Sequence, residues 1–224
     1  MTLLAEDLLL LMLDEESGKP LVDSTKLPRV LAGAVLLDLA LTGVVTPAEP
    51  GEDARKGRLV IRTQEFPEDP LLRDAVEIVG KGRPLKPESA IEKLSKGIRD
   101  KVATRLVADG WVREERSRIL GLFPSVRWPQ VDGSREHALR AEIGASLVDG
   151  ITPTHRTAAL ISLIAAVDVA PKLFPNADKR AMKKRAKEIA EGDWAGKAVR
   201  KAVDAVNTAI MIAATTPAIV AASS

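Results

Sequence analysis

The stretch of this chain whose residue types most clearly suggest chemistry is an apolar segment set between basic residues. It runs from Arg113 to Pro129 with the sequence REERSRILGLFPSVRWP. Its apolar residues are Ile119, Leu120, Leu122 and Phe123, and its flanking arginines are Arg116, Arg118 and Arg127. A hairpin with an apolar tip and basic flanks can enter a bilayer interface while its arginines meet lipid phosphates. The same pattern also fits an ordinary strand whose apolar side packs on the core.

A winged-helix interpretation of this region stays open. The apolar spacing of Ile98–Asp109 predicts a helix, and a helix followed by a hairpin wing can place that helix in a DNA groove. Its exposed face would carry Arg99, Lys101 and Arg105. Because Asp100 interrupts this face and no extended basic arm is present, we rank nucleic acid below a membrane surface as a partner.

A second basic segment, Lys179–Lys187, favours a structural role. Six of its nine residues are lysine or arginine. The spacing of the remaining residues predicts a helix with Ala181, Met182, Ala186 and Ile189 packed inward and the cations in solvent. An anionic partner for this face is the weaker alternative.

Signals of catalysis are nearly absent from the sequence. It contains no nucleophile elbow, no Gly-rich phosphate loop and no metal-ligand motif. The two histidines, His137 and His155, lack carboxylates at matching spacing, and cysteine is absent. We therefore expect no enzymatic activity, no metal and no cofactor. A helical scaffold that binds protein tails without lipid is a further alternative.

Composition predicts one mainly α domain over residues 1–224. The chain is 46% apolar but has only three Trp, three Phe and no Tyr, so its core must be aliphatic. Alanine and leucine favour helix. The net charge of +2 gives no global signature of polyanion binding. No charged-then-apolar signal peptide opens the sequence, which indicates the cytoplasm.

The element that must position these residues is the stretch Leu27–Gly43, LPRVLAGAVLLDLALTG. A helix that is apolar nearly all round belongs inside a protein or a membrane, and this one is short and contains Asp38. We expect it to be a buried central helix. The preceding segment Thr2–Leu13 is predicted as a helix capped by Thr2, although Leu8–Leu13 also fits a strand paired with Leu21 and Val22.

Other patterns predict one or two hairpins and several outer helices. Val44-Val45 and Arg58–Thr63 are expected to pair across a polar loop. Residues 87–110 predict two helices broken at Gly97, with Ser89 as a cap, and Ser134 is expected to cap another helix. Further helices are predicted over 70–81, 134–149, 154–170, 178–191 and 194–216.

Four segments resemble the Golgi phosphoprotein 3 family. The most specific is Leu31–Gly43, which resembles the family signature L-x-G-x-x-L-x-[DE]-L-A-L-x-G. The opening TLLAEDLLLLMLDEESGK, the helix Ile98–Val112 and the helix Arg156–Asp168 resemble other family segments in the same order. The Asp-Ser-Thr before the central helix and the Ala-rich tail are typical of a bacterial, actinobacterial member.

The resemblance implies a mostly helical protein at the inner face of a membrane. Eukaryotic members bind phosphatidylinositol 4-phosphate, help retain glycosyltransferases and insert an apolar hairpin that also supports homo-oligomer contacts. Their paired basic residues match Lys96 and Arg99, which share a helix face and can clamp one phosphate. The family's central-helix arginine falls on Ala32.

The remaining correspondences concern the other side of the same pocket. The family's tryptophan falls near Asp23. Because the family's arginine falls on the uncharged Ala32, Arg29, one turn earlier, is our candidate for the missing charge. The inserting hairpin matches Ile119–Phe123, with Arg127 just beyond it. The resemblance thus implies an anionic membrane surface, protein tails and a second copy of the chain as partners.

Overall fold

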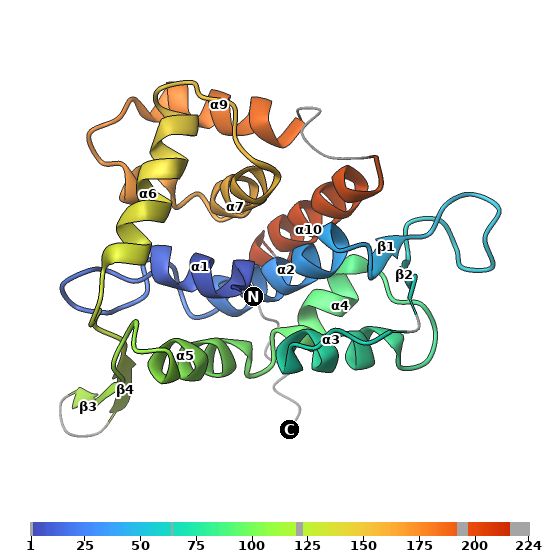
Figure 1. The fold of residues 1–224 in the computed structure, drawn as a ribbon, viewed down its shortest axis with the longest axis horizontal. Coiled ribbons are helices and arrows are strands. Elements are labelled where there is room, and N and C mark those ends of the chain that lie inside the picture. The colour runs from blue at the N-terminus through green and yellow to red at the C-terminus, as the bar shows by residue number, and fades with distance from the viewer. Residues whose placement is uncertain (1, 64, 120–122, 192–196, 216–224) are drawn as a thin grey trace, which may run out of the picture.

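The computed structural model describes residues 2–63, 65–119, 123–191 and 197–215. Within these residues the chain is mainly α-helical, which confirms the predicted fold class (Figure 1). The helices are α1 (Leu4–Leu11), α2 (Lys26–Leu41), α3 (Pro70–Gly80), α4 (Pro87–Leu94), α5 (Ile98–Ala108), α6 (Ser134–Leu147), α7 (His155–Ala166), α8 (Ala170–Leu173), α9 (Lys179–Glu191) and α10 (Lys197–Thr215). The strands are β1 (Val45–Pro47), β2 (Leu59–Ile61), β3 (Glu115–Ile119) and β4 (Phe123–Arg127).

Helix α2 forms the centre of the core, as its composition predicts. Twelve of its sixteen residues are buried, and α1, α4, α5, α7 and α10 pack around it. Gly33 lets α10 approach closely, because a Cβ there would lie 2.7 Å from Ile210 and 2.9 Å from Val206. Over the part of the chain that is described, no helix combines the length and the apolar character needed to cross a bilayer.

The segment before α2 is a helix rather than a strand. Helix α1 is buried along its whole length. The strand alternative survives only just beyond it, where Leu13 bridges Pro20 and the Leu21 N–H donates to the Met12 carbonyl at 2.8 Å. The predicted cap is wrong: Leu3, not Thr2, precedes the first helical residue.

Both predicted hairpins are present. Strands β1 and β2 pair antiparallel as expected, with Val45 opposite Ile61. In the second hairpin the charged stretch itself forms β3, and Ile119 lies opposite Phe123 at the end of the ladder. Of the apolar segment Ile119–Phe123, the first residue ends β3 and the last begins β4, and residues 120–122 lie outside the described part of the chain.

Two of the predicted helix starts are wrong. Ser89 lies inside α4, which begins at Pro87 after Lys86. Ser134 is the first residue of α6 and Gly133 precedes it. The break at Gly97 is confirmed: this residue has φ 72° and separates α4 from α5.

The later helices are shorter than predicted. Helix α7 was predicted to continue to Ala170 and to be stopped by Pro171. It ends at Ala166 instead, and Asp168 follows with a left-handed φ of 55°. In α9 the side chains of Met182, Ala186 and Ile189 are buried as predicted, whereas Ala181 is exposed. Trp194, the predicted start of the last helix, lies outside the described residues.

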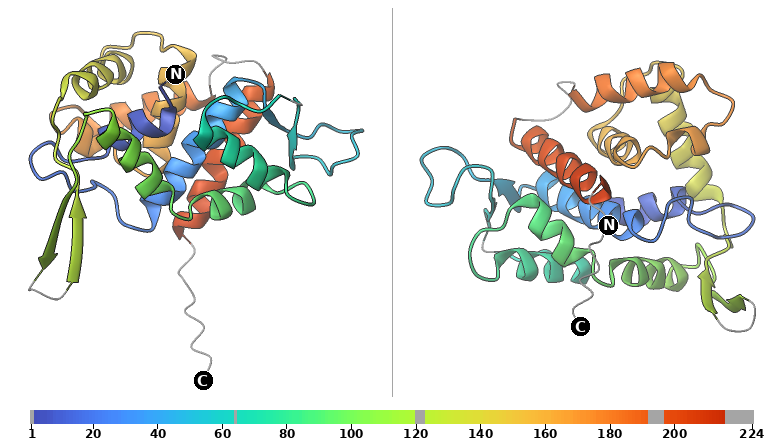
Figure 2. Two further views of the ribbon diagram at one scale, coloured as in Figure 1. Left: turned by 60° about the horizontal axis from the view of Figure 1, so that its bottom comes forward. Right: turned by 180° about the vertical axis from the view of Figure 1, so that it is seen from behind.

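The two hairpins lie at opposite ends of the long axis. Figure 1 places β3 and β4 at one lower end, whereas the loop that joins β1 to β2 projects from the other. Both views in Figure 2 show the same separation, with the helices between them. A ligand bound at one hairpin is therefore far from a ligand bound at the other.

Candidate functional site

The paired basic residues Lys96 and Arg99 lie where α4 passes into α5. Lys96 occupies the turn between the helices, and Gly97 supplies the left-handed backbone that the turn requires, so the prediction that Lys96 and Arg99 share one helix face is wrong. The Lys96 side chain is exposed, and none of the described residues forms an ion pair with it. Arg99 follows in the first turn of α5. The turn therefore presents one cation directly to solvent.

Arg99 rests on a buried tryptophan. Its guanidinium lies 5.3 Å from the centroid of the Trp128 ring, within the range of a cation–π contact. It also lies 2.8 Å from the Asp100 carboxylate. Trp128 is only 1% exposed and its indole N–H has no partner among the described residues. Trp128 therefore orients Arg99 from below and is not itself accessible to a ligand.

A glycine fixes the position of Trp128. The Trp128 backbone N–H donates to the Gly18 carbonyl at 2.8 Å. Gly18 has φ 63°, and a Cβ on it would lie 2.2 Å from the Pro129 nitrogen. The turn after α1 thus packs against the backbone that follows β4. The local sequence pattern gave no sign of this contact, because its partners are far apart in the chain.

Arg127 lies at the base of the second hairpin, immediately before Trp128. It is opposite Glu115 in the β3–β4 ladder, and the two side chains are 2.8 Å apart. The predicted inserting residues Leu120 and Leu122 lie outside the described residues. For Ile119 and Phe123 only the backbone is described. The hairpin base and the start of α5 therefore meet at the contact between Arg99 and Trp128.

Arg29 is engaged with a carboxylate. Its Nε donates to Glu92 on α4 at 2.6 Å, and its Nη1 donates to the Thr25 carbonyl at 3.0 Å. Ala32 is fully buried in the core, so it cannot line a surface pocket. Asp23 is exposed and accepts the N–H groups of Thr25 and Lys26 at the start of α2. The structure therefore places Arg99 against Trp128, the residue after Arg127, and commits Arg29 to Glu92.

The exposed face of α5 offers few cations to nucleic acid. Lys101 pairs with Asp74 at 2.7 Å, and Arg105 pairs with Asp69 at the same distance. Arg99 pairs with Asp100, as described above. Because a phosphate backbone is bound most readily by cations that are not already neutralised, the pairing of Lys101 and Arg105 with carboxylates counts against the winged-helix hypothesis.

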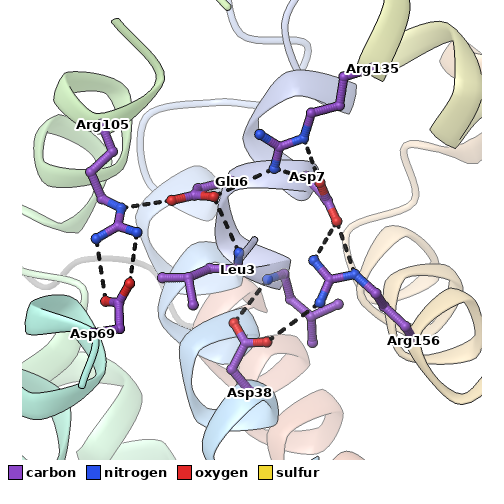
Figure 3. Close-up of polar contacts among 9 residues, drawn as sticks. Leu3, Glu6, Asp7, Asp38, Asp69, Arg105, Arg135 and Arg156 are labelled. Atoms are coloured by element: carbon purple, nitrogen blue, oxygen red, sulfur yellow. Dashed lines mark hydrogen bonds and ion pairs between the residues drawn. The ribbon is translucent and has the colours of Figure 1, made fainter. Parts of the chain in front are cut away.

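A buried ionic network surrounds α1. Glu6 and Asp7 are 2% and 3% exposed, and Asp38 on α2 is 1% exposed. Figure 3 shows that Arg105, Arg135 and Arg156 reach these carboxylates from three different helices. Arg105 donates to Glu6 at 2.6 Å, and Arg135 donates to Asp7 at 2.6 Å. Each of the two α1 carboxylates is therefore neutralised by an arginine from another element.

Asp38 connects this network to the central helix. Its carboxylate accepts the Leu4 N–H at 2.9 Å and lies 3.9 Å from Arg156. Burial raises the pKa of Asp38 to about 7, opposed by the Leu4 N–H and by Arg156 and reinforced by the charges of Asp7 and Glu6. Asp38 is buried and its carboxylate accepts the Leu4 N–H, so we assign it a structural role at the start of α1.

A group of potential metal ligands was not anticipated from the sequence. The ligand atoms of Glu15, Glu136 and His137 lie within 4.8 Å of one another. However, Arg140 approaches both carboxylates, at 2.5 Å from Glu136 and 3.3 Å from Glu15. A guanidinium already occupies the place of a cation here, so the chemistry of this donor set does not favour a metal.

Comparison with known proteins gives one clear match. A family model described as Golgi phosphoprotein 3 (GPP34) matches residues 4–206. No curated protein matched the chain. The matched range contains α1 to α9, the first part of α10 and both hairpins.

Proposed function

The chain belongs to the Golgi phosphoprotein 3 family, and we propose that it is a non-catalytic peripheral membrane protein that binds anionic, phosphoinositide-like head groups. The observation that carries the proposal is the exposed Lys96, three residues before Arg99, whose guanidinium rests on Trp128 next to the β3–β4 hairpin. In this proposal the protein acts at the inner, cytoplasmic face of a membrane.

Lys96 and Arg99 would meet the phosphate, each in a different way. Lys96 is an exposed point charge on a turn, free to follow a mobile head group. Arg99 is held in one orientation by Trp128, which lowers the entropy lost when it forms hydrogen bonds to phosphate. An arriving phosphate would compete with Asp100 for the Arg99 guanidinium.

Arg127 and the hairpin would add a second contact with the membrane. Arg127 lies beside the β3–β4 ladder, whose far end leads to Leu120 and Leu122. Those apolar residues would enter the interface while the arginine stays at the level of the phosphates. Because Arg127 pairs with Glu115, we assign it less of the binding free energy than Lys96.

The expected affinity is modest and sensitive to salt. Each basic residue near an anionic surface contributes on the order of 1 kcal/mol, so three give weak binding. Two copies of the chain on one membrane would raise the apparent affinity through avidity. We therefore include homo-oligomerisation in the proposal. The binding of protein tails is included because the family resemblance implies it.

The hairpin tests the insertion part of the proposal. We expect Leu122→Glu combined with Phe123→Glu to reduce co-sedimentation with anionic vesicles at least tenfold, because carboxylates oppose entry into the interface. The control replaces two exposed apolar residues elsewhere, Val131→Glu with Val148→Glu, which are 60% and 53% exposed. Equal binding by the two double variants would refute insertion by the hairpin.

A further inference from the structure

A second group of arginines lines a cleft at the end of the molecule opposite the β3–β4 hairpin. The cleft has a volume of about 410 Å³. It lies between the loop that joins β1 to β2 and the loop that joins α3 to α4, and it is lined by Asp53, Ala54, Arg55, Arg58, Arg83 and Pro84. Three guanidinium groups therefore share one cleft with a single carboxylate.

The two loops that form this cleft are tied together by hydrogen bonds. The Arg58 Nη1 donates to the Pro84 carbonyl at 2.7 Å, and the Leu59 N–H donates to the Leu85 carbonyl at 2.8 Å. Gly57, at φ 80°, donates its N–H to the Ala48 carbonyl at 3.0 Å and closes the first loop. The base of the cleft is therefore fixed by both loops and does not depend on either alone.

The charge in the cleft is not balanced by neighbouring residues. Segments 53–58 and 81–86 together contain six basic residues and one acid, Asp53. Arg55 and Arg83 are exposed, and no described residue forms an ion pair with either guanidinium. By contrast, Arg29, Arg105 and Arg135 each form an ion pair with a carboxylate. Arginines that converge from two loops and have no carboxylate partner are typical of an anion-binding site.

We propose that this cleft binds a phosphorylated anion through Arg55, Arg58 and Arg83. The planar guanidinium fork matches the oxygens of a phosphate, and charge-assisted bonds of this kind are strong. One N–H of Arg58 donates to the Pro84 carbonyl, and its remaining N–H groups would donate to the ligand. Ala54 and Pro84 form a small apolar wall of the cleft. The phosphate arrives either on a lipid head group or on a soluble molecule.

The proposal is tested with inorganic pyrophosphate and the full chain, by titration calorimetry in a buffer free of phosphate. The variant is Arg55→Gln with Arg83→Gln, which leaves Arg58 and its bond to Pro84 in place. We expect pyrophosphate affinity to fall at least tenfold. The control is Lys19→Gln with Lys93→Gln, which removes two charges from exposed residues outside the cleft, and should change affinity less than twofold.

Vesicles of phosphatidylcholine with phosphatidic acid distinguish the two sources of phosphate. Loss of vesicle binding in the arginine variant indicates a lipid head group, and loss of pyrophosphate binding alone indicates a soluble ligand. The proposed site is refuted if the arginine and lysine variants have equal effects in both assays. It is also refuted if the unaltered chain binds neither pyrophosphate nor the vesicles. The substitutions at Arg55 and Arg83 leave Lys96, Arg99 and the hairpin unaltered, so their effect on pyrophosphate binding decides this site separately from the proposed function.

Discussion

At the residue scale, Asp38 makes the stability of the protein depend on pH. The pKa of the Asp38 carboxyl is about 7 in the folded chain and about 3.8 in the unfolded chain. The carboxyl therefore stays protonated to a higher pH in the folded chain. Between these values the folded chain binds more protons than the unfolded chain, and stability therefore falls as pH rises from about 4 to about 7. The full effect is on the order of 4 kcal/mol.

The substitution Asp38→Asn tests this dependence. Asparagine keeps an oxygen that can accept the Leu4 N–H but does not titrate. Urea unfolding at pH 5 and pH 8 should show a smaller loss of stability with rising pH in the variant than in the unaltered chain. An unchanged difference between the two pH values would show that Asp38 is not the titrating group.

Gly18 is the residue on which the position of Trp128 depends. We expect Gly18→Ala to cost roughly 1–2 kcal/mol for the left-handed backbone, and more for the approach of its Cβ to Pro129. Gly43→Ala is the matched control, because Gly43 has φ 73° but nothing within 4 Å of a Cβ. Urea unfolding measures both costs, and equal costs would contradict the close packing at Gly18.

The sequence predicted individual cations but not their partners. Lys96 and Arg99 were identified through the resemblance to the family, and Lys96 is exposed in the structure. The contact of Arg99 with Trp128 and that of Arg29 with Glu92 join segments far apart in the chain. Local spacing carries no information about such pairs, because they depend on how the helices pack.

At the scale of elements, α1 is held by charge as well as by apolar packing. Asp7 accepts hydrogen bonds from Arg135 and Arg156, so Asp7→Asn leaves two partly buried arginines without their carboxylate. We expect a loss of roughly 3 kcal/mol in the free energy of unfolding. Urea denaturation measures it directly.

An exposed ion pair provides the control for Asp7. Asp74 pairs with Lys101, and both side chains are about half exposed, at 53% and 50%. Asp74→Asn should therefore cost less than about 1 kcal/mol. If the two substitutions destabilised the protein equally, the network around α1 would not be what fixes that helix.

Helices were easier to predict than their first residues. A long apolar stretch such as α2, or a break at Gly97, leaves a clear signal because burial and left-handed backbone restrict residue type. The starts of α4 and α6 were missed because Ser89 and Ser134 resemble caps but lie inside the helices. In α4 the proline at position 87 sets the start, since its fixed φ suits a first turn.

At the scale of the whole molecule, the proposed contacts with anions lie at different ends. The hairpin β3–β4 and the loop between β1 and β2 are separated along the long axis (Figure 1). Arg99 is joined to the hairpin end through Trp128, whereas Arg55 and Arg83 line the cleft at the other end. A protein built this way has the means to contact a membrane at one end and a phosphorylated ligand at the other.

The central claim is that Lys96 and Arg99 bind anionic head groups. The most direct measurement is co-sedimentation with vesicles that contain phosphatidylinositol 4-phosphate and with neutral vesicles, at low and moderate salt, for the unaltered chain and for Lys96→Gln with Arg99→Gln. We predict binding to the anionic vesicles only, weakened by salt and reduced at least tenfold in the variant. Equal binding to both kinds of vesicle, or no effect of the two substitutions, would contradict the claim.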